Sequence, residues 1–293
     1  MNRPAVLDRL LRLELRARRI VEGLLMGKQA SPYHGSAVEF ASHRQYSPGD
    51  ELRHLDWKVW WKTQRLYVKQ HDEETHLPCH LVVDASRSMR YGDESGWSKY
   101  DHAATAAASL AQLLVRQQDA AGLVIFRDAV TKQLPPSSHR QQADAIAREL
   151  DAVRPESGTD LGSSLADLAS RFRRRGMVVL ISDLMVEATE LAAALRDLHA
   201  RRHEVLVLHV LHGDELAFPF DGVTLFRGLE DSDELQADPA ALRRSYLREF
   251  EAFLDRTRRE CLRASADYQL VDMRLPLEAV LADLLSRRAR SRS

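Results

Sequence analysis

The sequence predicts an α/β fold in which helices cover both faces of a doubly wound, mostly parallel sheet. Between residues 79 and 276, short and nearly continuous apolar segments alternate with longer amphipathic ones. Continuous apolar strands are typical of a parallel sheet that helices bury on both faces. Two of these segments end in aspartates, Asp84 and Asp183. Ligands of such sheets bind outside the carboxyl ends of the strands, so the acids stand where a site is expected.

Each expected element follows from its own pattern. Short apolar runs bounded by turn residues predict strands, and apolar residues at helical spacing predict helices. The acidic segment 218–239 shows neither pattern, so we expect it to be irregular. The expected strands cover 79–84, 122–126, 130–134, 177–182, 204–211 and 268–273, and the expected helices cover 100–118, 141–153, 161–175, 187–200 and 242–264.

Residues 1–78 are interpreted as an N-terminal extension that packs on the domain of residues 79–276. Leucines at helical spacing predict an amphipathic helix over residues 5–25. The extension has too few apolar residues for a core of its own, so we do not expect it to fold alone. Phe40, Leu55 and Trp57 are expected to bury against the domain. Residues 277–293 are expected to form a C-terminal helix and a basic tail.

Composition excludes several classes of protein. The formal net charge is −1, which argues against nucleic-acid binding by bulk electrostatics. The two cysteines, Cys79 and Cys261, belong to no C-x-x-C pair, so neither a disulfide framework nor a zinc site is predicted. No apolar run is long enough to span a bilayer, and the N-terminus lacks the apolar region of a secretory signal. We therefore expect a cytoplasmic protein.

An acid and two hydroxyls follow the first expected strand at alternate positions, as Asp84, Ser86 and Ser88. Residues two apart on an extended chain point the same way, so the three side chains can converge. Their oxygens suit a hard cation such as Mg²⁺ (or Mn²⁺) rather than zinc or copper. Because three ligands do not complete an octahedron, this interpretation requires further ligands downstream.

Two later segments offer those ligands. Thr159 lies in a polar turn before a helical stretch, and Asp183 follows another apolar run. With these parts in order the chain resembles the von Willebrand factor A domain, whose metal-ion-dependent adhesion site uses the pattern D-x-S-x-S, a later Thr and an Asp that ends a later strand. Helix capping and turn formation are the ordinary roles of each residue alone, but the full set favours a metal site. The resemblance implies the metal ligands Asp84, Ser86, Ser88, Thr159 and Asp183.

A second resemblance covers residues 39–57. These residues resemble the signature E-F-x-x-x-R-x-Y-x-x-G-D-x-x-R-x-[IL]-D-W of an uncharacterised bacterial and archaeal family with A-domain-like C-terminal halves. The chain departs from that family at residues 59–62, which puts only the local surface in doubt. Members are typically associated with MoxR-type AAA+ ATPases, which implies such an ATPase as a partner. Within the signature, Arg44, Asp50, Arg53 and Asp56 are more simply explained as a structural ion-pair cluster than as a binding surface.

The combined patterns predict a non-enzymatic protein that binds partners through a divalent cation. A partner's Glu or Asp would complete the coordination, in a chaperone-like assembly or activation of a client. The sequence shows no nucleophile with an evident base and no phosphate-binding loop. A metal-dependent phosphoester hydrolase and a metal-free structural scaffold remain as alternatives. The side chains expected to be exposed around the ion and to anchor a partner are Arg87, Met89, Arg90, Tyr91 and Trp97.

Overall fold

The computed structural model describes residues 13–29, 43–45, 67–69, 77–92, 96–155, 167–172, 174–228 and 234–291. The chain divides into two compact units, one of residues 29–76 and one of residues 1–28 together with 77–293. In the smaller unit, β1 (His43–Gln45) pairs antiparallel with β2 (Tyr67–Lys69). Phe40, Leu55, Trp57 and the signature acids lie outside the described residues, so their expected packing stays a prediction.

A six-stranded sheet organises the larger unit, in the order β10-β7-β6-β3-β4-β5. Neighbouring strands are parallel except at the β4–β5 edge, which is antiparallel. After β3 the chain adds β4 and then β5 on one side, and after β6 it adds β7 and then β10 on the other side. This is the doubly wound arrangement. The predicted fold class is therefore confirmed. The strands are β3 (Cys79–Asp84), β4 (Ala121–Phe126), β5 (Val130–Ser137), β6 (Met177–Ser182), β7 (Glu204–Leu211) and β10 (Ala266–Asp272).

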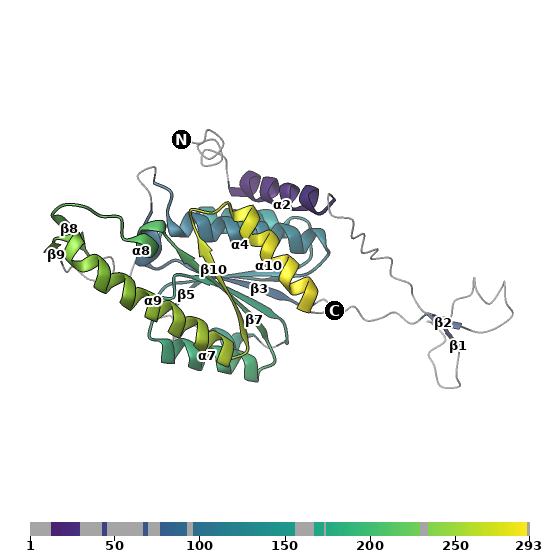
Figure 1. The fold of residues 1–293 in the computed structure, drawn as a ribbon. Helices are drawn as coiled ribbons and strands as arrows, with labels where there is room; N and C mark the ends of the chain where they lie inside the picture. Colours follow the sequence, from purple (N-terminus) through teal and green to yellow (C-terminus); the bar gives the residue numbers. More distant parts are fainter. Residues whose placement is uncertain are drawn as a thin grey trace. The chain divides into compact units, whose positions relative to one another are not determined.

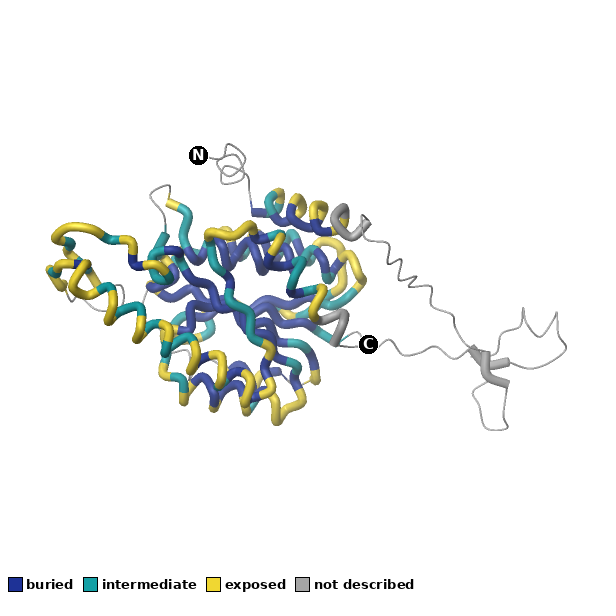
Figure 2. The backbone as a smooth tube through the Cα atoms, in the orientation of Figure 1, coloured by how far each residue is buried: buried dark blue, intermediate teal, exposed yellow. Residues whose placement is uncertain are grey.

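Helices cover both faces of this sheet, which explains its continuous apolar strands (Figure 1). Successive strand residues divide between two cores: Leu81 and Val83 pack with the helices of one face, and Val82 packs with those of the other. Figure 2 shows the buried strands between the partly exposed helices. One layer holds α2 (Leu13–Gln29), α4 (Lys99–Arg116), α5 (Gln142–Asp151) and α10 (Leu277–Ser291), and the other holds residues 167–171, α7 (Ala188–Ala200) and α9 (Pro239–Arg263).

The helix α4 lies directly against the sheet and begins at a well-defined residue. Ser98 and Asp101 form a capping box, in which each side chain accepts a hydrogen bond from the other residue's backbone N–H. The alanines of α4 are small enough to allow close approach to the sheet, and most of the helix is buried. The cap therefore places Lys99, the first helical residue, inside the domain.

The helix α2 packs into the same core as α4 although it precedes the small unit in the chain. Its Leu13, Ala17, Ile20 and Leu24 are buried in that core. Arg18 of α2 also makes two hydrogen bonds to the Asp144 carboxylate of α5, at 2.8 and 2.9 Å. An apolar stripe and a paired arginine thus hold this part of the N-terminal extension on the larger unit.

The prediction that residues 218–239 are irregular is wrong for the described part of that segment. After α8 (Gly213–Ala217), strands β8 (Thr224–Arg227) and β9 (Glu234–Ala237) form an antiparallel pair. Phe218 stacks on Phe226 and on Tyr246 of α9. These aromatic contacts between distant residues stabilise a hairpin that strand periodicity alone does not indicate. None of the described helices is long and apolar enough to cross a membrane.

We predict that protonation of buried histidines destabilises the fold in acid. Burial lowers the pKa of His102 to about 4, with Asp272 opposing only in part. The unfolded chain takes up this proton near pH 6.5 and the folded chain near pH 4, so stability should fall as pH drops through that window. Replacing His102 with Leu should reduce the acid-induced loss in the free energy of unfolding by on the order of 2 kcal/mol. Urea unfolding at pH 7.5 and 4.5 measures this loss of stability, and His139→Gln, at an exposed histidine, is the control. An equal loss of stability in wild type and in His102→Leu would contradict the prediction.

Candidate functional site

The candidate site lies where the winding of the sheet changes direction, between neighbouring strands β3 and β6. The chain leaves β3 toward β4 and leaves β6 toward β7, so the two following loops diverge. The gap between such loops is the usual ligand site of an open α/β sheet. Asp84 is the last residue of β3, Ser182 is the last residue of β6, and Asp183 follows it. The topology thereby brings together two acids that are far apart in the sequence.

Asp84 is completely buried and is held by two hydrogen bonds. The backbone N–H of Ser86 donates to its Oδ1 at 2.8 Å, and the Ser182 hydroxyl donates to its Oδ2 at 2.6 Å. Ser182 in turn accepts a hydrogen bond from the backbone N–H of Leu184 at 2.9 Å. One carboxylate therefore connects the loops after both strands and has a fixed orientation.

The two serines of the predicted motif converge next to Asp84. Their Oγ atoms are 3.0 Å apart, and both side chains are buried. Ser86 precedes the short helix η2 (Arg87–Arg90), but its hydroxyl makes no capping hydrogen bond there. Capping therefore does not explain Ser86, and its hydroxyl faces Ser88 as the metal prediction requires.

Asp183 forms a buried ion pair that the sequence did not indicate. The Lys99 ammonium lies 2.8 Å from Asp183 Oδ2 and 2.7 Å from Glu215 Oε1. Lys99 and Asp183 are each only 1% exposed. A cation at the first position of a helix opposes the helix dipole and therefore needs compensating acids. That misplaced charge is the signal by which Lys99 could have been singled out.

Negative charge is in excess at the site. Burial, and then the nearby Asp183 charge, raise the pKa of Asp84 from 3.8 to about 7. Burial alone would lower the pKa of Lys99, but Asp183 and Glu215 overcome that effect and raise it. Two carboxylates, those of Asp183 and Glu215, therefore contact one ammonium, and the Asp84 carboxyl lies near enough to Asp183 for its pKa to be raised. Protonation of Asp84 or a bound cation would relieve the imbalance.

His209 of β7 positions the Asp183 loop without carrying charge. Its Nε2 donates to the Asp183 carbonyl at 2.8 Å, so its Nδ1 accepts from the Tyr268 hydroxyl at 2.7 Å. Burial lowers the pKa of His209 to about 4 despite the opposing effect of Asp183. Both ring nitrogens are thus engaged, and His209 is not available as a general base.

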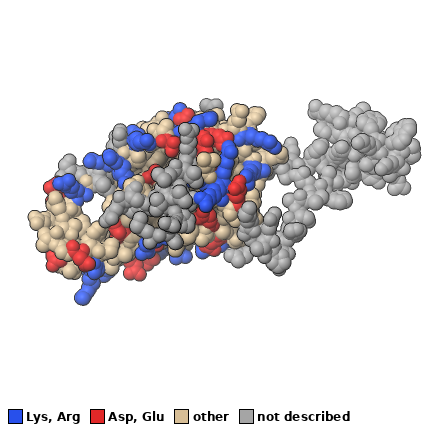
Figure 3. All heavy atoms as spheres, turned by 90° about the horizontal axis from the view of Figure 1, so that it is seen from above, with Lys and Arg blue, Asp and Glu red and all other residues tan. Residues whose placement is uncertain are grey.

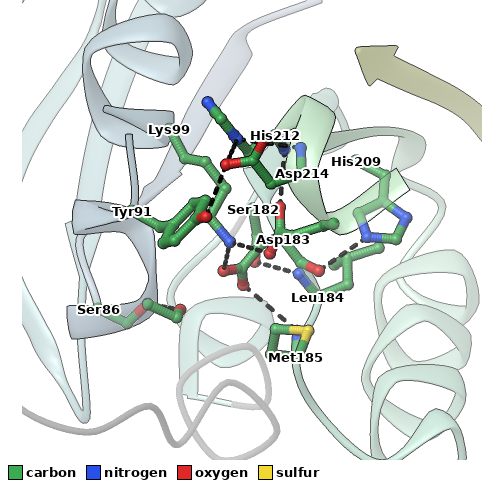
Figure 4. A network of polar contacts seen from close by, with 12 residues as sticks. Ser86, Tyr91, Lys99, Ser182, Asp183, Leu184, Met185, His209, His212 and Asp214 are labelled. Carbon is green, nitrogen blue, oxygen red and sulfur yellow. Dashed lines mark hydrogen bonds and ion pairs between the residues drawn. The ribbon is translucent and has the colours of Figure 1, made fainter. Parts of the chain in front are cut away.

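The helix α8 supplies an outer layer of this network (Figure 4). Glu215 also accepts a hydrogen bond from the His212 backbone N–H through Oε2 at 2.7 Å, which fixes the acid at the start of α8. Tyr91 donates to Asp214 Oδ2 at 2.8 Å, and its ring meets the His212 ring edge-on at 5.0 Å between centroids. The loop after β3 and the start of α8 are therefore tied to one another.

The predicted ring of exposed anchors needs correction. Arg87 and Arg90 are exposed as expected. Met89, however, is fully buried in the core, because the turn of η2 directs it inward. Tyr91 and Trp97 are only partly exposed, and the Arg16 guanidinium lies 4.7 Å above the Trp97 ring. Among the described residues, Met185, two residues after Asp183, is an exposed apolar side chain beside the site.

The residues described at the site fit a hard divalent cation in donor type. Four of the five predicted ligands gather here, namely Asp84, Ser86, Ser88 and Asp183, whereas Thr159 lies outside the described residues. No three His, Cys, Asp or Glu side chains gather as a metal-binding group in the part of the chain that the structure describes. An ion here would therefore depend on hydroxyls together with few carboxylates, which suits Mg²⁺ or Mn²⁺.

Comparison with known proteins identifies relatives over most of the chain. Residues 42–255 match the family model described as "Protein of unknown function DUF58". Uncharacterized proteins of Mycobacterium bovis and Mycobacterium tuberculosis are each 31% identical over 234 residues, which is 78% of this chain and 73% of theirs.

Solved structures give more distant similarities. The conserved hypothetical protein BatB of Bacteroides thetaiotaomicron is 17% identical, covers 73% of this chain and 99% of its own, and superposes with a TM-score of 0.48. The VWA domain of SpRpn10 is 13% identical, covers 70% of this chain and 94% of its own, and has a TM-score of 0.40. At these values neither structure bears on the site, whose description depends on its own geometry.

We predict that neutralising Asp84 stabilises the metal-free protein at high pH. The pKa of Asp84 is higher in the folded than in the unfolded chain, so its protonated form favours folding. This contribution to the free energy of unfolding is complete below pH 3.8 and is lost as pH rises through about 7. With chelator present, the free energy of unfolding of Asp84→Asn relative to wild type should therefore rise by at least about 1 kcal/mol between pH 5 and pH 8. Thermal melts across that range measure the gain, and a constant difference between the two proteins would contradict it.

Proposed function

The chain belongs to the DUF58 family, and we propose that it is a non-enzymatic protein that binds partners through a divalent cation, Mg²⁺ or Mn²⁺. The excess of carboxylates over cations at the switch point of the sheet is the main support for an ion. Asp84, Ser86 and Ser88 offer oxygen donors from one turn, and Asp183, which follows the neighbouring strand β6, is near enough to affect the pKa of Asp84. Thr159 is proposed as the fifth ligand from the resemblance to the von Willebrand factor A domain.

A cation held by hydroxyls and few carboxylates keeps much of its positive charge. The oxygen of a partner's Glu or Asp would then be an attractive additional ligand. Arg87, Arg90 and Met185 are exposed around the site and are of the kinds that anchor protein interfaces. The site is therefore suited to recognising an acidic side chain on another protein.

A MoxR-type AAA+ ATPase is the proposed partner, and chaperone-like assembly or activation of a client is the proposed role. The support is the resemblance of residues 39–57 to the family signature. The charge distribution of the described surface is consistent with a protein partner, because acidic and basic side chains are interspersed over the face shown in Figure 3. A nucleic-acid partner would favour a continuous basic patch.

The contacts at the site bear on the hydrolase alternative through its two described histidines. A hydrolase needs a general base beside the metal. His209 has both ring nitrogens in hydrogen bonds, and the His212 Nδ1 accepts the backbone N–H of Asp214 at 3.2 Å. Asp93 and Asp160 also lie in the segments that carry the motif residues, and both are outside the described residues.

A metal-free scaffold is the second candidate, and one observation favours it. The Lys99 ammonium already supplies a positive charge to Asp183. If the lysine alone were sufficient, the protein would need no ion. Metal binding by purified protein separates the two candidates directly.

We predict a single divalent site per chain. Titration calorimetry should detect Mg²⁺ or Mn²⁺ binding that Asp84→Ala abolishes, because this variant removes a carboxylate at the centre of the cluster. Asp197→Ala is the matched control, since Asp197 pairs with Arg201 on the surface of α7 and should leave binding unchanged. Equal binding by wild type and Asp84→Ala would refute the metal site.

We also predict that complex formation with a purified MoxR-type ATPase of the same organism requires the ion. Chelator should abolish the complex, and Mg²⁺ should restore it. The variant Arg87→Ala/Arg90→Ala should weaken the complex at least about fivefold without changing metal affinity, because both arginines are exposed beside the site. Surface plasmon resonance measures both effects.

Two results would count against this proposal. A complex that is indifferent to chelator would contradict a metal-bridged contact. Metal-dependent hydrolysis of p-nitrophenyl phosphate by pure protein, lost in Asp84→Ala, would favour the hydrolase.

A further inference from the structure

Lys99 is a buried cation at the site, and its ammonium lies between two acids from different elements. One acid is Asp183 at the end of β6, and the other is Glu215 of α8. The capping box of Ser98 and Asp101 fixes the helix start that carries this lysine. The three N–H donors of an ammonium allow it to keep one acid while releasing the other.

The same Asp183 carboxylate is a proposed ligand of the divalent ion. Its Oδ2 accepts from Lys99 at 2.8 Å, and its Oδ1 accepts from the Met185 backbone N–H at 3.3 Å. A divalent ion beside Asp183 would lie a few ångströms from the ammonium. Repulsion between two cations at that separation is strong wherever few water molecules screen it. Lys99 and the ion therefore compete for Asp183.

Glu215 offers the displaced ammonium a second position. Its Oε1 is already 2.7 Å from Lys99, and its side chain is 18% exposed, so water can share in solvating the pair. Lys99 need not leave the protein when Asp183 turns to the ion. Because Glu215 also accepts the His212 N–H, the stronger pair would form at the start of α8.

From this geometry we infer that Lys99 is a tethered cation that competes with the divalent ion for Asp183, and that ion binding transfers its ammonium to Glu215. This inference depends on the proposed metal site. It implies that wild-type protein binds the ion more weakly than its carboxylates alone would allow. It also makes α8, with the Tyr91–Asp214 contact, the element that responds to ion occupancy.

Titration calorimetry with Mn²⁺ on the full chain tests the competition. Lys99→Met should bind Mn²⁺ at least about tenfold more tightly than wild type, because the repelling charge is gone. Glu215→Gln should bind more weakly, because Lys99 loses its alternative acid. The double variant Lys99→Met/Glu215→Gln, which leaves no unpaired charge at Glu215, should bind more tightly than Glu215→Gln. Lys132→Met, which breaks the surface pair with Glu149, should match wild type.

The outcomes separate this inference from the proposed function. Suppose that wild type binds Mn²⁺, that Lys99→Met binds it no more tightly than wild type, and that the double variant binds it no more tightly than Glu215→Gln. The competition is then overturned, whereas the metal site is supported. If neither wild type nor any variant binds Mn²⁺, both the competition and the proposed metal site are refuted. Binding by Lys99→Met but not by wild type would support the competition in its strongest form.

A measurement on wild type avoids any folding defect of the variants. With ¹⁵N-labelled lysine, the hydrogen-bonded ammonium of Lys99 should give a protected NMR signal that shifts on Mg²⁺ addition and returns with chelator. The signal of Lys132 should not move. Saturating Mg²⁺ that leaves the Lys99 signal unchanged would overturn the transfer to Glu215.

Discussion

The buried contact of Lys99 with Asp183 and Glu215 is the constraint on which the described site depends. Removing charges from water is costly, and the cost is recovered only when partners are close and well oriented. Here the lysine comes from the start of α4, one acid from the end of β6 and the other from α8. The contact therefore determines how three elements meet at the edge of the sheet. Loss of Lys99 would leave the buried Asp183 carboxylate without its cation, whereas loss of one acid would leave the lysine paired with the other.

The apolar layers make that polar cluster possible. Strand residues pack alternately into two cores, which hold β3 and β6 side by side and bring their carboxyl ends to one point. Ser182 and His209 then orient the two acids through uncharged hydrogen bonds. Rigid strands and neutral donors keep Asp84 near Asp183 despite their repulsion. That repulsion, together with burial, is the reason that the pKa of Asp84 is raised.

A lysine and a divalent ion are alternative ways to neutralise the same carboxylates. The lysine belongs to the chain and requires nothing from solution, whereas an ion adds a position that a partner's acid can occupy. A site that used both would have two states. In one, Lys99 neutralises Asp183; in the other, an ion does so and a partner's acid can bind to it. The coupling that we propose between them would need no large movement, because Glu215 already contacts the ammonium and α8 already contacts Tyr91 through Asp214.

The sequence by itself determined the sheet and its flanking helices, and it indicated which four side chains would lie near the ends of β3 and β6, because each depends on local periodicity or on spacing within one turn. Asp84, Ser86 and Ser88 lie within one short segment, and Asp183 ends a strand with a clear apolar pattern. Only the tertiary structure decided that Lys99 contacts Asp183 and Glu215, that Met89 is buried and that Phe218 supports the β8–β9 hairpin. Partners 84 and 116 residues away from Lys99 leave no local pattern. Such contacts arise only when the strands have taken their order and the loops at their ends have met.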